Sequence, residues 1–422
     1  MSALLKTSNP IKQLSTSALV MTSIFSLGVN VVWIPYNLLL LPLLVQGATT
    51  PATKATVLGI LVGGSTLVSI VISILAAIVS DHTRSRFGRR RPMMIAGLIL
   101  SLPFLFMPIF FQHSLFLVSL SFLGIQIFTN ISSAAFQPTL ADFIPPEQRG
   151  TSAGLKGLFT FIGAAIGVGG ITALFALKQE TLAYILIPVF FTLTTLLNVF
   201  AMRKYDKPTP EVERLKLGHL LVDMFRVQRI SNGFFWFIFG SFLIYVGIAG
   251  FQFFGTYYIE TILHITNQSV LARTVDIVGV VSLIVSMVFA IGAGVLSDKV
   301  GRRNIIAASA LLAALVGLVF PVAQTLSIFI VFGALYSASS GVILSVDTAL
   351  TSDLVPPQEA GKYMAYAGLA TGMSNVVAPP LFGLILNSQG APTMASFIIF
   401  FIVSAVAYVG SALVMLLKVP NR

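Results

Sequence analysis

The feature that most limits the fold of this chain is a series of twelve long apolar runs separated by short polar breaks. Each run has about 20 residues or more, which is the length that an α-helix needs to cross a hydrocarbon core of roughly 30 Å. The runs cover residues 18–44, 55–79, 93–112, 114–140, 152–177, 181–202, 233–258, 271–296, 304–323, 326–351, 363–387 and 393–417. The sequence therefore predicts an all-α membrane protein with twelve transmembrane helices.

The composition excludes an ordinary water-soluble domain. Only 9% of the 422 residues are charged, against about 25% in soluble domains, and the mean hydropathy is +0.95. The net charge of +11 does not indicate a nucleic-acid partner, because the basic residues lie between the apolar runs and form no binding face. The chain has no cysteine, which excludes disulfides and thiolate metal sites. We expect neither a metal nor a cofactor.

The basic residues predict the orientation of the chain in the membrane. Twelve spans place both termini on one side, and 21 of the 25 Lys and Arg residues fall in segments on that side. Only Lys54, Lys178 and Arg273 fall in segments on the other side. Cytoplasmic connections carry an excess of basic residues. We therefore expect a multi-pass protein of the cell membrane with both termini in the cytoplasm.

Two motifs recur, once in each half of the chain. The segment SDHTRSRFGRRRP at 80–92 returns as SDKVGRRN at 297–304, and ADFIPPEQRG at 141–150 returns as SDLVPPQEAG at 352–361. The offset from Gly88 to Gly301 is 213 residues and that from Asp142 to Asp353 is 211, so the two almost agree. A duplicated six-helix unit is typical of transporter folds, in which the substrate site lies near the middle of the membrane where the repeats meet.

The repeat divides the chain into three parts. We expect an N-terminal six-helix bundle over 1–202, a cytoplasmic linker over 203–232 and a C-terminal six-helix bundle over 233–422. Within the linker, Thr209, Pro210 and Glu211 precede an apolar stripe, which predicts an amphipathic helix on the inner membrane surface.

After spans two and eight, an aspartate is followed by basic residues and by the sequence Gly-Arg-Arg. This pattern resembles the loop signature of the major facilitator superfamily. Its longer form, TRSRFGRRRP, is similar to the sucrose-type and glycoside–pentoside–hexuronide branch. This resemblance implies a secondary active transporter that moves a small polar solute, a sugar or glycoside, by proton symport with alternating access. Sodium coupling is not expected, because melibiose-type relatives carry aspartates in helix two and span two here has none.

Two other classes of function stay open at this point. One is proton-linked efflux of amphiphilic compounds, since the Gly-rich fifth span is similar to an antiporter motif, although Val168 stands where that motif has proline. The other is a membrane-embedded enzyme. The chain has no H-E-x-x-H, G-x-S-x-G or nucleotide-binding loop, so we expect no enzyme. We expect a monomer whose partners are the solute, protons and lipid.

The repeated motifs supply a predicted cytoplasmic gate. The resemblance implies that these residues form ion pairs that latch the halves together in the outward-open state. The gate comprises Asp81, Arg86, Gly88, Arg89, Arg90, Asp142, Arg149, Asp298, Lys299, Gly301, Arg302, Arg303 and Asp353. The alternative is a plain orientation anchor, which explains the positive charge but not the recurring Asp and Gly positions.

Polar residues form stripes at spacing i, i+4, i+11 on the first and fourth helix of each half, and so lie on one face of each helix. The resemblance implies that these helices line a central cavity. The predicted substrate-binding residues are Asn30, Asn37, Gln126, Asn130, Gln137, Tyr245, Gln252, Tyr336 and Ser340. The alternative is interhelical hydrogen bonding, which Ser, Asn and Gln provide in any membrane bundle.

Charged residues inside the spans are costly and often functional. Asp347 is the candidate for proton coupling, and its alternatives are pairing with a loop arginine or contact with water. Asp276 is expected to pair with Arg273 one turn away. Glu260 is expected to be solvated, and Lys156 to reach Asp142.

Three G-x-x-x-G pairs predict close helix contacts, because glycine lets helix backbones approach. The pairs are Gly59/Gly63, Gly163/Gly167 and Gly368/Gly372. In the resembled superfamily, the spans that carry them pack across the interface between the halves.

Overall fold

The computed structural model describes residues 13–83, 85–206, 231–354 and 360–420, and these residues form helices and connections without a strand. Within the described residues, twelve helical segments are long and apolar enough to cross a membrane. The predicted fold class is therefore confirmed. The first span, Thr16–Ala48, is longer than the apolar run that predicted it.

Short breaks divide some spans into several helices. The first half contains α1 (Thr16–Ser23), α2 (Phe25–Pro35), α3 (Leu41–Ala48), α4 (Lys54–His82), α5 (Arg91–Phe106), α6 (Leu115–Phe136), α7 (Thr139–Phe143), α8 (Arg149–Ile166), α9 (Thr172–Ala176) and α10 (Glu180–Met202). The second half contains α12 (Asn232–Ile262), α13 (Gln268–Val300), α14 (Arg302–Val319), α15 (Leu326–Leu354), α16 (Ala360–Leu386) and α17 (Met394–Lys418). The predicted linker helix lies outside the described residues.

Side-chain caps fix where several helices begin. The Ser114 hydroxyl accepts a hydrogen bond from a backbone N–H in the first turn of α6, and the Asn267 side chain accepts two at the start of α13. Thr393 and Ser396 form a reciprocal capping box at the start of α17. Such caps satisfy N–H groups that have no partner within the helix.

Two π-helical segments interrupt spans of the first half. The segment η1 (Tyr36–Leu40) follows Pro35, which has no N–H to donate to the α-helical ladder. The segment η4 (Gly167–Ile171) lies in a glycine-rich run between α8 and α9. Both segments contact α13 of the second half. Single π turns are frequent at functional sites.

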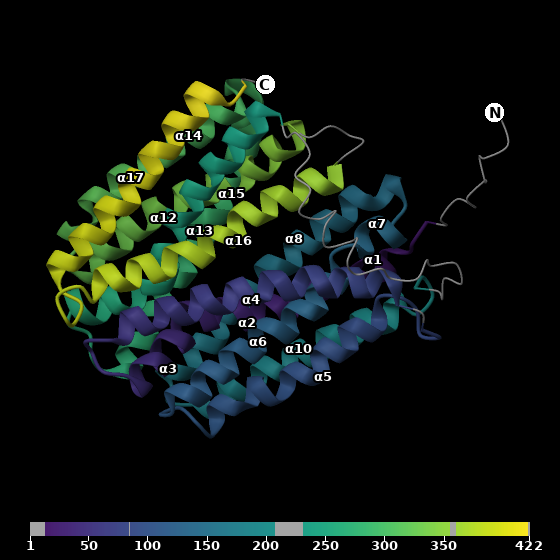
Figure 1. The fold of residues 1–422 in the computed structure, drawn as a ribbon, viewed down its shortest axis with the longest axis horizontal. Coiled ribbons are helices and arrows are strands. Elements are labelled where there is room, and N and C mark those ends of the chain that lie inside the picture. The colour runs from purple at the N-terminus through teal and green to yellow at the C-terminus, as the bar shows by residue number, and fades with distance from the viewer. Residues whose placement is uncertain (1–12, 84, 207–230, 355–359, 421–422) are drawn as a thin grey trace.

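The two halves meet closely at the end of the molecule that carries the connection 49–53, which we call the Lys54 end. Helices α4 and α16 pack against each other there (Figure 1). A Cβ added at Gly59 would lie 2.1 Å from the Pro379 carbonyl oxygen, and one at Gly383 would lie 2.4 Å from that of Ala55. Glycine at these positions is therefore what permits the contact.

The same two helices diverge toward the other end, which carries residues 80–92 and which we call the arginine-rich end (Figure 1). A Cβ added at Gly372 would first meet the flexible end of the Ile70 side chain at 3.0 Å. At Gly368, one turn further, it would meet nothing within 4 Å. The halves are therefore closed at the Lys54 end and apart at the arginine-rich end.

The predicted glycine pairs behave differently from one another. Gly63 packs on α16, as expected, where a Cβ would lie 2.6 Å from the Val376 carbonyl oxygen. Gly163 and Gly167 instead pack on α2 of their own half, against Leu27 and Pro35. The expectation that the fifth span uses its glycines across the interface is therefore wrong, because those glycines face the first span.

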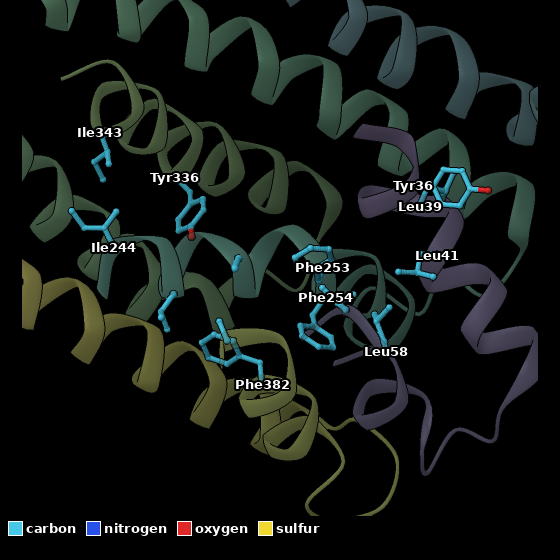
Figure 2. Close-up of a cluster of buried hydrophobic side chains, with 14 of the residues drawn as sticks. Tyr36, Leu39, Leu41, Leu58, Ile244, Phe253, Phe254, Tyr336, Ile343 and Phe382 are labelled. Atoms are coloured by element: carbon cyan, nitrogen blue, oxygen red, sulfur yellow. The ribbon is translucent and has the colours of Figure 1, made fainter. Parts of the chain in front are cut away.

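A buried apolar cluster runs through both halves. It includes Leu58 of α4 and Phe254 and Phe382 of the second half (Figure 2). Large apolar side chains such as Phe116 and Leu417 lie exposed on the outside of the helices. Such a surface suits contact with lipid chains, and it agrees with the twelve predicted spans.

Candidate functional site

A cavity of about 320 Å³ lies between the two halves. Its first-half wall consists of Ile34, Leu38, Ala164 and Val168. Its second-half wall consists of Ile248, Phe251, Gln252, Gly255, Thr256, Ile259, Val275, Val278, Gly279, Ser282, Leu283, Ser286, Phe329, Tyr336, Ser337 and Ser340. The first-half wall is wholly apolar, and every hydroxyl and amide side chain in the lining belongs to the second half.

Three predicted binding residues line this cavity, namely Gln252, Tyr336 and Ser340. The Tyr336 hydroxyl lies 3.0 Å from the Gly247 carbonyl oxygen and 2.5 Å from the Tyr408 hydroxyl. These contacts fix the tyrosine ring beside the cavity. Ser340 donates to the backbone of its own helix at 3.1 Å, and its oxygen can still accept a hydrogen bond.

The predicted first-half residues lie outside this lining. The side-chain amides of Asn30 and Asn130 donate to the carbonyl oxygens of Ser26 and Gln126 on their own helices, at 2.8 and 2.7 Å. Asn37 is half-buried on η1. The structure thus brings together the predicted residues of α12 and α15, but it does not bring those of α2, η1 and α6 into the same cavity.

Sequence reasoning missed the contribution of α13 to the cavity. Ser282 and Ser286 lie four residues apart on this helix and both line the cavity. Ser337 and Thr256 complete the set of overlooked hydroxyl residues. The i, i+4 serine pair was a detectable signal, but it lies on the second helix of its repeat rather than on the first or fourth.

Asp347 lies in α15 and is 8% exposed. Its carboxylate accepts hydrogen bonds from Ser241 at 2.7 Å and from Tyr245 at 3.2 Å, both on α12. Among the described residues, no basic side chain forms an ion pair with it, which removes the loop arginine as its partner. Tyr245, predicted to bind substrate, is thus engaged with this carboxylate.

Lys156 of α8 does not reach Asp142. Its ammonium group donates to Gln137 at 2.7 Å and lies 5.1 Å from the centre of the Phe136 ring. The expected pairing is wrong because two arginines already occupy Asp142. Gln137, a predicted substrate-binding residue, is therefore bonded to a cation at the first-half side of the arginine-rich end.

Asp276 of α13 contacts Thr172 of α9 rather than Arg273. The distance between the Thr172 hydroxyl oxygen and a carboxyl oxygen of Asp276 is 2.6 Å. The expected intrahelical ion pair is absent among the described residues because the carboxyl faces the other half, whereas Arg273 is exposed. This contact joins the two halves.

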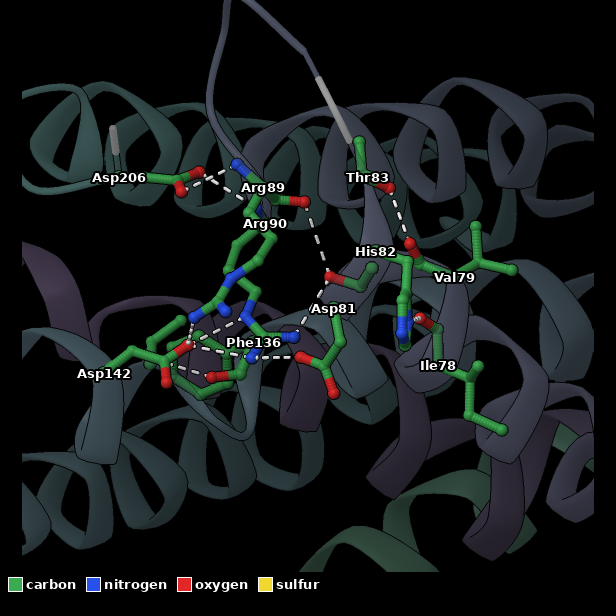
Figure 3. Close-up of polar contacts among 12 residues, drawn as sticks. Ile78, Val79, Asp81, His82, Thr83, Arg89, Arg90, Phe136, Asp142 and Asp206 are labelled. Carbon is green, nitrogen blue, oxygen red and sulfur yellow. Dashed lines mark hydrogen bonds and ion pairs between the residues drawn. The ribbon is translucent and has the colours of Figure 1, made fainter. Parts of the chain in front are cut away.

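At the arginine-rich end, the predicted gate residues of the first half form a compact network (Figure 3). Arg90 pairs with Asp81 at 2.5 Å and with Asp142 at 2.8 Å, and Arg89 pairs with Asp142 at 2.8 Å. Gly88 has φ +97°, the left-handed region that the predicted tight turn requires. Arg86 is exposed and stacks over the Phe87 ring.

Asp206 anchors this loop and was not predicted. It is 2% exposed and accepts hydrogen bonds from the backbone N–H groups of Arg89, Arg90 and Arg91 at 2.8–2.9 Å (Figure 3). These groups lie at the start of α5, so Asp206 caps that helix from a distant segment. A Cβ at Gly88 would lie 2.4 Å from the Asp206 carbonyl oxygen, which is a second reason for glycine there.

The second half repeats part of this network. Arg302 pairs with Asp353 at 2.9 Å and donates to the Ala349 carbonyl oxygen, while Arg303 donates to that of Val419. Gly301 repeats the φ of +97°. Three predicted gate residues remain. Arg149 donates to the Ile144 carbonyl oxygen, and Lys299 is exposed. The side chain of Asp298 is not among those that the structure describes.

Among the ion pairs between described residues at the arginine-rich end, none joins the N-terminal bundle to the C-terminal bundle. The predicted latch between the halves would form only when this end closes. It therefore stays a prediction for the opposite conformation.

The Lys54 end contains an ion pair between the halves. Lys54 of α4 lies 2.5 Å from Glu260 of α12, and their side chains are 7% and 15% exposed. Gln46 also donates to Glu260 at 2.7 Å, and the Lys54 ammonium lies over the Tyr257 ring. The expectation that Glu260 is solvated is wrong, because residues of the first two spans enclose it.

Twelve described helices that are long and apolar enough to cross a membrane, with a cavity between the two halves, form an arrangement typical of membrane transporters. The profile of the Major Facilitator Superfamily matches residues 14–292 and 272–422, and the chain belongs to that family. The resemblance to the sucrose-type branch within it stays a prediction.

Two curated relatives align with a short part of the chain. The Aspyridones efflux protein apdF of Emericella nidulans is 29% identical over 98 residues, or 23% of this chain and 20% of that protein. Multidrug resistance protein 3 of Bacillus subtilis is 30% identical over 95 residues, or 22% and 19%. The aligned part of this chain thus spans about a fifth of the length of each relative.

Solved structures resemble the whole chain. A D-xylose-proton symporter has 16% identity and a TM-score of 0.69, with 96% of this chain and 97% of the other covered. The nucleoside transporter NupG has 12% identity and a TM-score of 0.71, with 94% and 98% covered. A bacterial homologue of the human lysosomal transporter Spinster has 14% identity and a TM-score of 0.70, with 95% and 96% covered. At these identities the likeness shows the fold alone.

Proposed function

We propose that this transporter moves an uncharged amphiphilic solute that carries hydroxyl groups, such as a glycoside, by proton symport with alternating access. The observation that carries this proposal is the two-sided cavity. Aliphatic side chains form its first-half wall, whereas serine, threonine, tyrosine and glutamine side chains lie on its second-half wall. None of the lining residues is charged, which favours a neutral solute.

The size and chemistry of the cavity support this class of solute. Its volume of about 320 Å³ falls in the usual range for small-molecule sites, about 300–1,000 Å³. Phe251 and Tyr336 offer ring faces to an apolar or sugar ring. Gln252 can both donate and accept hydrogen bonds, as paired sugar hydroxyls require.

Proton coupling is assigned to Asp347. A buried carboxyl inside a membrane span is costly when ionised, so such residues often serve in proton transfer. The hydroxyls of Ser241 and Tyr245 stabilise its charged form. Because Asp347 and the cavity residues Tyr336 and Ser340 lie on α15, movement of this helix would link protonation to solute binding.

The structure, which is closed at the Lys54 end, corresponds to one step of the proposed alternating-access cycle. If the arginine-rich end is cytoplasmic, as the basic residues predict, the protein is open to the inside and closed by the Lys54–Glu260 pair. In the outward-open state the proposed gate would form between the bundles 1–202 and 233–422. The linker 203–232 would connect them.

Proton-linked efflux of amphiphilic compounds is the second candidate. The wholly apolar first-half wall favours it, and both curated relatives carry names that denote efflux or multidrug resistance. The two functions share a cavity and differ in the direction in which proton flow drives the solute.

Counterflow in proteoliposomes separates these functions. We expect a labelled glycoside from a panel of sugars and glycosides to exchange, and its uptake to alkalinise the outer medium. A hydrophobic dye that is expelled against its gradient, with no effect of any sugar or glycoside, would instead favour efflux.

The coupling role of Asp347 is tested by Asp347→Asn. The amide retains the shape, and its oxygen can accept from one of the two hydroxyls of Ser241 and Tyr245 while its NH2 group donates to the other, but it cannot carry a proton. We expect proton-driven accumulation to be lost and solute exchange to continue. The matched control is Thr348→Ala, because the exposed Thr348 bonds only to its own helix. Unchanged accumulation in Asp347→Asn would remove this residue from coupling.

A further inference from the structure

A second carboxyl lies inside the membrane, at the contact between the halves. Asp276 of α13 is half-buried and lies 2.6 Å from the hydroxyl oxygen of Thr172, the first residue of α9. Val275 and Gly279, its neighbours on the helix, line the cavity. Asp276 lies beside Val275, which is the α13 lining residue nearest to the start of that helix, so it lies at the edge of the cavity that faces the Lys54 end. Separation of the halves at that end would break this contact.

The hydrogens available at this contact bear on the protonation state of Asp276. The Thr172 hydroxyl oxygen is within hydrogen-bond distance of two acceptors, the Val168 carbonyl oxygen and the Asp276 carboxyl. A threonine hydroxyl has one hydrogen to donate. If that hydrogen goes to Val168, the short contact with Asp276 requires a hydrogen on the carboxyl, which then donates to Thr172.

On its own helix, the basic residue nearest to Asp276 is Arg273, one turn away, and its side chain is exposed. Among the described residues no basic group forms an ion pair with it, and the segments η4 and α9 that face it contain no titratable residue. The other elements that contact α13 carry these titratable groups: Tyr36 on η1, Arg149 and Lys156 on α8, Tyr245, Tyr257, Tyr258 and Glu260 on α12, Arg302 and Arg303 on α14, and Tyr336, Asp347 and Asp353 on α15. Of these, Glu260 and Asp347 already have partners on other helices.

We propose that Asp276 is a second carboxyl that binds a proton during the cycle, and that its protonated form holds the Lys54 end closed by donating a hydrogen bond to Thr172. The proton comes from water on that side when the end is open, and it returns there when the end opens again. This inference deepens the proposed function, since it rests on proton coupling. Asp347 differs because two hydroxyls donate to it, so its contacts are complete without a proton.

The test measures the opening of the Lys54 end directly. Because the chain has no cysteine, spin labels can be attached to the full-length protein at Gln179→Cys and Val270→Cys. Both positions are exposed near this end, one in each half. Distances between the labels are measured in lipid nanodiscs over a range of pH. In the wild type we expect the ratio of closed to open molecules to rise as the pH falls through the titration of Asp276.

Two variants identify the residue that titrates. Asp276→Asn keeps a donor for Thr172. The ratio of closed to open molecules should therefore stay high at every pH and no longer change with the titration of Asp276. Thr172→Val removes the acceptor and should lower the closed ratio at acidic pH by about two- to tenfold, as expected for one hydrogen bond. Because each variant changes a single residue, its comparison with the wild type isolates the contribution of the Asp276–Thr172 contact. A titration of Asp276→Asn that matches the wild type would overturn the proposal.

Asp347→Asn is the control that separates this proposal from the coupling proposal. We expect it to retain the pH response at the Lys54 end although it loses accumulation. If Asp347→Asn abolished the response and Asp276→Asn did not, one carboxyl would govern both events and the present proposal would fall. If the wild type showed no proton-driven transport, the proposed function would fail while the distance titration still reported on Asp276.

Discussion

Asp206 shows how a single buried side chain can determine the shape of a loop. Its carboxylate accepts from three consecutive backbone N–H groups and lies against the turn at Gly88. The arginines of this loop are then free to direct their side chains toward Asp142 (Figure 3). The charge network therefore depends on an acid that lies outside the repeated motif.

Removal of this acid should destabilise the protein. In Asp206→Ala, three N–H groups at the start of α5 lose their acceptor, and each buried unsatisfied group costs about 1–3 kcal/mol before relaxation. We expect a loss of about 2 kcal/mol or more, measured as a lower Tm in detergent. The control is Asp81→Ala, because the Asp81 side chain is 48% exposed and its partner Arg90 keeps the ion pair with Asp142 in this variant. Equal Tm values for the two variants would contradict the capping role.

Sequence patterns predicted individual residues well where the cause was local. The turns at Gly88 and Gly301 have the expected left-handed backbone. Contacts between distant segments were not predictable in this way. Lys54 and Glu260, or Thr172 and Asp276, are far apart in sequence, and nothing in the period of either helix encodes the partner. Lys156 was expected to reach Asp142, but two arginines pair with that carboxylate.

Among the helices, α4 and α16 form the contact that closes the Lys54 end, and their glycines can be tested. Gly59→Ala would place a methyl group against the Pro379 carbonyl oxygen. Overpacking of this kind costs about 1–3 kcal/mol, and separation of the helices relieves it. We therefore expect a shift toward the state open at the Lys54 end, seen as faster labelling of Ser282→Cys by an impermeant thiol reagent from that side.

Gly64→Ala is the matched control for this experiment. Gly64 lies on the same helix, and a Cβ there would meet nothing within 4 Å. Its labelling rate should equal that of the parent protein. The same acceleration in both variants would mean that helix propensity, rather than the contact with α16, causes the effect.

The helices were predictable as spans, but not in their internal irregularities. Hydropathy and capping residues locate most ends within a few residues, as for Leu326–Leu354 against the predicted 326–351. The π segments η1 and η4 were not predicted, because an i→i+5 turn leaves no periodic signal in a single sequence. Pro35 and the glycines of η4 make such turns possible, and the contact with α13 selects them.

At the scale of the whole molecule, the Lys54–Glu260 pair should control which end is open. Glu260→Gln leaves the Lys54 ammonium enclosed without its acid partner, and breaking a buried pair in this way costs about 3–5 kcal/mol. Opening of the Lys54 end returns the lysine to water. We therefore expect the labels at positions 179 and 270 to report a mostly open population.

A second substitution should partly reverse this effect. Lys54→Met combined with Glu260→Gln removes the unpaired charge, so the closed population should recover relative to Glu260→Gln alone. If the single and double variants gave the same distance distribution as the wild type, the ion pair would not hold the halves together.

The hydrogen-bonding side chains lie on only one wall of the cavity, and this affects how the solute moves when the protein changes conformation. A solute that is hydrogen-bonded to residues of the C-terminal bundle would move with that bundle. The aliphatic wall of the N-terminal bundle would move past the solute without breaking a hydrogen bond. Selectivity would then be a property of the C-terminal portion. Chimaeras that exchange whole bundles between related carriers should inherit their cargo preference from that parent.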